Sequence, residues 1–67
     1  MTQSYEEVLE NVLIELLVLT ASAPLGTIVA FNQLCEGIAR ELNPKILDRC
    51  VDYANYRIDQ LKSQNNL

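Results

Sequence analysis

The sequence predicts an all-α, three-helix domain, and three observations support this. Hydrophobic residues make up 49% of the 67 residues, while glycine and proline number only two each, a composition typical of compact helices rather than of disorder. Apolar residues recur at helical spacing in three segments. Turn-forming residues separate the segments at Pro24–Gly26 and Asn43–Pro44. We therefore expect one domain over residues 1–67, with helices at about 4–21, 27–42 and 44–62.

The first predicted helix begins with a capping signal. Ser4 and Glu7 form the S-x-x-E pattern, in which hydroxyl and carboxylate satisfy free amides of the first turn. In its C-terminal half the helix is apolar almost all the way round, with Glu15 the only polar residue of segment 12–19. The main apolar face is expected to contain Tyr5, Leu9, Val12, Leu13, Leu16 and Leu19, with Val8 and Leu17 at its edges.

This excess of apolar residues predicts association. A surface helix normally has one apolar stripe and one polar face, and a domain this small is only marginally stable alone. The other two helices should cover the main face and leave Ile14 and Val18 uncovered. We therefore expect a homodimer, or a complex with another protein, whose interface contains Ile14, Leu17 and Val18, with Leu25 or Val29 nearby.

The second predicted helix is clearly amphipathic. It should begin near Gly26 or Thr27, although Ser22 could cap an earlier start before Pro24. Gly37 lies within it and costs about 1 kcal/mol relative to alanine, either as a tolerated weakness or because a neighbour approaches closely. Its expected core face consists of Ile28, Phe31, Leu34, Cys35, Ile38, Ala39 and Leu42.

The third predicted helix follows an Asn-Pro turn. Asn43 is a good N-cap, and Pro44 suits the first helical position. So short a linker lets the second and third helices form a hairpin or a corner, and the polar tail 63–67 should fray. The expected core face consists of Leu47, Val51, Ala54, Ile58 and Leu61, flanked by Ile46, Cys50 and Tyr53.

The two cysteines fall on expected core faces at similar distances from the Asn-Pro turn. Cys35 and Cys50 therefore form either a redox pair or two buried thiols that act as small hydrophobic side chains. The sequence has no secretory signal, so we expect a cytoplasmic location. Thiols stay reduced there, which favours the second reading.

Charge is distributed unevenly along the chain. Residues 1–39 carry five glutamates and no basic residue, a charge of −5, whereas residues 40–67 carry five basic and four acidic residues, a charge of +1. The first helix should therefore lie against the more basic C-terminal part, within one chain or across a dimer. An acidic chain repels nucleic acids and anionic lipids, and its apolar run is shorter than the ~20 residues that span a bilayer. We expect neither nucleic acid nor membrane as a partner.

Two side chains of the third helix are candidates for contacts. Arg57 lies among apolar residues, so its head should either pair with Glu15 or extend to solvent without a fixed partner. Tyr56 lies on the polar side, where an aromatic ring suggests an interface.

The sequence lacks the residue types that most catalytic and metal sites use. Histidine is absent and there are two cysteines, which removes the common zinc patterns and the usual general base. We expect no enzyme activity, metal or cofactor. The sequence predicts a small interaction module, such as an adaptor, regulatory subunit or assembly factor, that self-associates through its first helix. The alternative is a transcription-related regulator in which the second and third helices form a helix-turn-helix-like pair, acting on DNA or on a DNA-binding partner.

Overall fold

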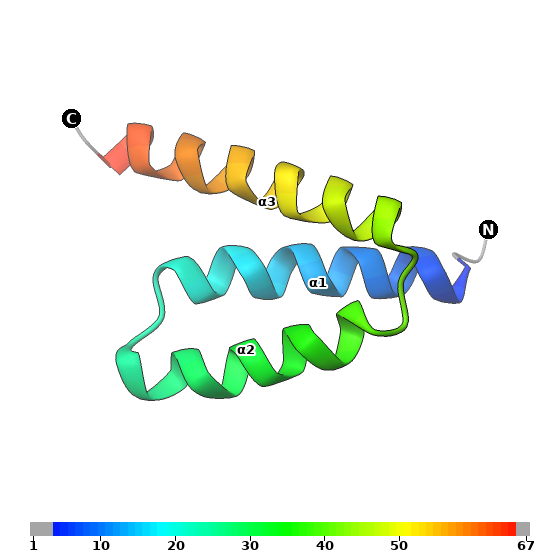
Figure 1. Ribbon diagram of the computed structural model, residues 1–67. Helices are drawn as coiled ribbons and strands as arrows, with labels where there is room; N and C mark the ends of the chain where they lie inside the picture. The colour runs from blue at the N-terminus through cyan, green and yellow to red at the C-terminus, as the bar shows by residue number, and fades with distance from the viewer. Residues whose placement is uncertain (1–3, 66–67) are drawn as a thin grey trace.

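The computed structural model describes residues 4–65 and confirms an all-α fold of three helices. They are α1 (Tyr5–Ala21), α2 (Leu25–Ala39) and α3 (Pro44–Asn65) (Figure 1). This part of the chain contains no strand.

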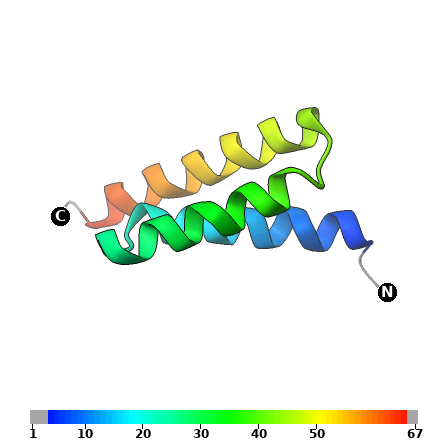
Figure 2. The same cartoon turned by 60° about the horizontal axis from the view of Figure 1, so that its bottom comes forward.

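The first helix in the chain is the middle helix in space. α2 lies on one side of α1 and runs antiparallel to it, while α3 lies on the other side and runs in the same direction as α1 (Figure 1). α2 and α3 pack mainly against α1 and touch each other little. Residues 40–43 join them at one end of the fold (Figure 2). In the view of Figure 1, α2 and α3 lie on either side of α1.

Both cap residues predicted at helix starts accept the expected hydrogen bonds. The Ser4 hydroxyl accepts from the amide of Glu7 at 3.2 Å, and Asn43 Oδ1 accepts from the amide of Lys45 at 2.9 Å. Each bond satisfies an amide in the first turn of a helix that would otherwise lack a partner. These two helices therefore begin where the local sequence predicts.

The bounds of α2 differ from the prediction. α2 begins at Leu25, with Pro24 as an N-cap that makes no side-chain bond. The hydroxyl of Ser22 instead donates to the carbonyl of Leu19 at 3.5 Å, at the end of α1. α2 ends at Ala39 rather than 42, because the chain tightens there: the amide of Leu42 donates to the carbonyl of Ala39 at 3.2 Å.

The third helix is longer than predicted. It continues to Asn65 rather than stopping at 62. The tail expected to fray, 63–67, is therefore helical as far as Asn65, and residues 66 and 67 lie outside the described part of the chain.

The hydrophobic core lies around the middle of α1. Leu13 is only 1% exposed and forms a cluster with Cys35 of α2, Leu42 of the connection and Cys50 of α3. Because α2, the connection and α3 each contribute a side chain to the cluster that contains Leu13, packing on Leu13 holds α2 and α3 against α1. Partly buried side chains extend the cluster: Leu9, Ile14, Leu16, Leu17, Ile38, Ile46 and Leu47.

The expectation that Ile14 and Val18 would stay uncovered is wrong. Val18 is 8% exposed, and Ile14 is half-buried and packs against the core cluster. The reason is the central position of α1. Since α2 and α3 cover different sides of it, the chain itself covers Ile14 and Val18. Of the expected main face, Leu9, Leu13 and Leu16 are covered too, whereas Tyr5, Val12 and Leu19 are exposed.

Gly37 lies in open space. No atom lies within 4 Å of the position that a Cβ would occupy. The first of the two readings of this residue therefore holds: it is a tolerated weakness of α2 and not a point of close approach.

Candidate functional site

The most prominent surface feature is a row of apolar side chains along α1. Tyr5, Val8, Val12 and Leu19 are 70%, 43%, 42% and 53% exposed. Together with Glu15 they follow the spacing 5, 8, 12, 15, 19, which alternates three and four residues and keeps all five on one helix face. We call these five residues the exposed α1 stripe.

The one charge in the exposed α1 stripe is paired within the chain. The guanidinium of Arg57 in α3 donates to Glu15 Oε1 and forms a salt bridge with it. This hydrogen bond is the main reason that the pKa of Arg57 is raised above its ordinary value. Of the two alternatives for Arg57, the fixed partner is the one found. The pair leaves the middle of the stripe without net charge.

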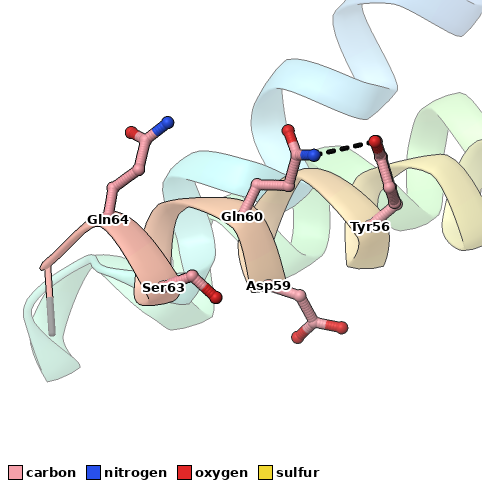
Figure 3. Close-up of a pocket in the computed structure, with 5 residues that line it drawn as sticks. All are labelled: Tyr56, Asp59, Gln60, Ser63 and Gln64. Atoms are coloured by element: carbon pink, nitrogen blue, oxygen red, sulfur yellow. Dashed lines mark hydrogen bonds between the residues drawn. The ribbon is translucent and has the colours of Figure 1, made fainter.

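Two tyrosines of α3 lie next to this ion pair. Tyr53, one helical turn before Arg57, is 51% exposed, and Tyr56 is 57% exposed. Their rings are stacked with centroids 6.4 Å apart. The Tyr56 hydroxyl accepts a hydrogen bond from Gln60 Nε2 at 2.7 Å (Figure 3). The sequence allowed Tyr53 either at the edge of the core or at an interface, and its exposure places it on the surface beside Arg57.

The other residues predicted for an interface are scattered. Leu17 is half-buried and packs against the core cluster. Leu25 and Val29 of α2 are 85% and 63% exposed. Both lie on α2, a different helix from the exposed α1 stripe, and we treat them as a separate candidate surface.

Both thiols are free and buried in one cluster. Burial raises the pKa of Cys35, and burial together with the charge of Glu10 raises the pKa of Cys50, partly offset by Arg49. A protonated, covered thiol is a poor nucleophile. Cys35 and Cys50 therefore serve the core as small apolar side chains.

Two pockets lie on the surface of the described residues. The larger, of about 380 Å³, is lined by α3 alone, and its side chains project outward in different directions (Figure 3). A smaller one of about 150 Å³ lies between the ends of α1 and α3, beside Val18, Leu61 and Lys62. Among residues 4–65, no three acidic or cysteine side chains gather as metal ligands. None of the three helices combines the length and apolarity needed to cross a bilayer.

The sequence predicted that Glu15, Arg57 and Tyr56 are accessible, and they are. It also predicted that Ile14 and Val18 are uncovered, and the exposed apolar side of α1 lies elsewhere. Tyr5, Val12 and Leu19 were expected in the core, and Val8 at its edge. The signal that marks them is their alternating spacing of three and four residues, which is that of a helix–helix seam. No protein-family model, curated protein or solved structure matches this chain.

Proposed function

We propose that the protein is a non-enzymatic interaction module that self-associates through α1. The observation that carries the proposal is the exposed α1 stripe with its internally paired charge. Adaptors, regulatory subunits and assembly factors are the classes of protein that such a module fits. The occupant we propose for the stripe is a second copy of the chain.

The small size of the core supports a partner. Six side chains of the described residues are buried, and only Leu13, Val18 and Leu42 among them are large aliphatics. The others are Cys35, Cys50 and Ala54. A domain of this length usually needs a further source of stability beyond its own core, and association through an apolar helix face supplies it.

The area of the surface fits a dimer. An aromatic side chain has about 150–250 Å² of surface, so the apolar residues of the stripe together with Tyr53 expose on the order of 500 Å² at their exposed fractions. Two such surfaces face to face would bury about 1,000 Å², the lower limit for a biological interface and the size of a weak or transient one. An apolar patch of this size is among the larger ones found on monomers, and such patches are often functional.

The pairing of Glu15 also favours an apolar partner surface. A lone carboxylate in the middle of the stripe would lose its hydration on association, which costs several kcal/mol. Arg57 already supplies the counter-charge and a hydrogen bond. The surface can therefore meet another apolar surface without the partner providing a cation.

Light scattering after size-exclusion chromatography tests the proposal. The wild-type chain should have the mass of a dimer, and Val12→Glu with Leu19→Glu should have the mass of a monomer and keep its helical circular dichroism. The matched control is Leu25→Glu with Val29→Glu, which changes the same two residue types on the exposed surface of α2 and should leave the dimer intact. A wild-type monomer contradicts self-association. A control that dissociates while the α1 variant does not would place the interface on α2.

The helix-turn-helix alternative has less support. In that motif two consecutive helices pack on each other and the second enters the major groove, whereas α2 and α3 pack mainly on α1. A salt-sensitive mobility shift on DNA at low salt would favour it over the self-associating module.

A further inference from the structure

We infer that two copies of the chain meet antiparallel along the exposed α1 stripe, with the two-fold axis beside Val12; this orientation rests on the self-association proposed above. Three properties of α1 and α3 lead to it: the symmetry of the stripe, the distribution of charge along α1 and the position of Tyr53.

The stripe is symmetric in length about Val12. Its two most exposed apolar side chains, Tyr5 and Leu19, each lie seven residues from Val12, about 10 Å along the helix at 1.5 Å per residue. An antiparallel arrangement centred on Val12 therefore places Tyr5 against the partner's Leu19 at both ends. Any antiparallel register centred elsewhere leaves one end of each stripe uncovered.

The charge in the stripe and the helix dipoles disfavour the parallel arrangement. Glu15 is the one charge in the exposed α1 stripe, and α1 carries no basic residue. A parallel pair centred on the stripe would set Glu15 at the height of its own copy and align the two helix dipoles, and both effects are repulsive. In the antiparallel pair the two Glu15 side chains are about 9 Å apart along the axis, each beside its own Arg57. The opposed dipoles then attract.

Tyr53 completes the contact near the axis. α1 and α3 run in the same direction (Figure 1), and Arg57 lies opposite Glu15. Tyr53, four residues before Arg57, therefore lies at about the height of residue 11, close to Val12. A two-fold axis perpendicular to α1 within the interface keeps α3 beside the partner's α3. The two exposed Tyr53 rings then approach each other over the axis, which suits the large, rigid contact area of an aromatic side chain.

Single-cysteine cross-linking tests the orientation. Three variants, Val12→Cys, Tyr5→Cys and Leu19→Cys, are oxidised mildly in separate samples. In a fourth sample, a size-tagged Tyr5→Cys chain is mixed with the Leu19→Cys chain and oxidised in the same way. The native thiols are buried, so the wild-type chain should not link, and Val29→Cys is the exposed valine control on α2. Circular dichroism and the mass before oxidation verify that each variant folds and dimerises.

The antiparallel arrangement predicts a distinct pattern. Val12→Cys should link to itself, because its two copies face each other within the ~7 Å between Cα atoms that a disulfide needs. Tyr5→Cys and Leu19→Cys should not link alone, since about 21 Å separates each pair of copies along the axis, but should link to each other when mixed.

The other patterns each overturn the inference in a recognisable way. If Tyr5→Cys and Leu19→Cys each link to themselves and the mixture does not link, the pair is parallel, and self-association through α1 stands without the orientation. If the chain is a dimer but Val12→Cys links no faster than Val29→Cys, the contact lies away from the stripe. A wild-type chain with the mass of a monomer overturns the proposed function itself.

Discussion

Replacement of Leu13 by alanine is the sharpest test of the central position of α1. Leu13 is 1% exposed and contacts a cluster made by α2, the connection and α3. A buried Leu→Ala change costs about 2–5 kcal/mol, and we expect the upper half of this range because three parts of the fold lose contacts at once. A chain of this length has a total stability of about 3–10 kcal/mol. The variant should therefore lose at least about a third of its stability, and all of it if the total lies at the lower end of this range.

The matched control is Leu19→Ala in the same helix. Leu19 is 53% exposed, so the same change removes far less buried surface, and alanine is the better helix former. We expect a change in the free energy of unfolding of less than about 1 kcal/mol. Urea denaturation followed by circular dichroism measures both variants, at a concentration low enough that the wild-type chain is monomeric. If Leu13→Ala and Leu19→Ala lower the free energy of unfolding equally, the assignment of the buried and exposed faces of α1 is refuted.

Two further predictions concern α2 and the buried thiols. Gly37→Ala should stabilise the monomer by about 1 kcal/mol and raise its Tm by about 4–8 °C, because no atom lies close to the position of the added Cβ. A Tm below that of the wild-type chain would mean that a neighbouring atom lies too close to residue 37. Burial raises the pKa of Cys35 and Cys50, so the folded chain holds thiol protons that the unfolded chain releases. Stability should therefore fall as the pH rises above about 8.5, the pKa of an unperturbed thiol. Thermal unfolding midpoints measured from pH 7 to 9.5 test this prediction. A midpoint that does not fall as the pH rises would contradict it.

Local signals predicted the helices well because they act within a few residues. Ser4 and Asn43 cap α1 and α3 as expected, since a cap depends on the next two or three residues. The start of α2 was harder to predict because no side chain caps it. Its end was overestimated because Leu42 continues the apolar spacing and is buried, although the chain around it has already left the helix.

The arrangement of the helices could not be predicted in the same way. Periodicity assigned one apolar face to the second and third helices and a second apolar stripe to the first. It left Arg57 either paired with Glu15 or without a fixed partner, and the fold shows the pair. It did not reveal that α1 lies between the other two. Because two neighbours cover α1 from different sides, Val18 is buried while Val12 and Leu19 are exposed. Which part of an apolar circumference faces solvent depends on where the neighbouring helices lie, and a single helix's sequence does not contain that information.

The central position of the first helix has a consequence for synthesis of the chain. α1 leaves the ribosome first, with two apolar sides that need cover. α2 follows within a few residues and can cover one side as a local hairpin, but the other side waits for α3. Until α3 packs on α1, the side of α1 around Val18 stays exposed to any apolar surface nearby. A chain truncated before Pro44 would keep that side bare permanently.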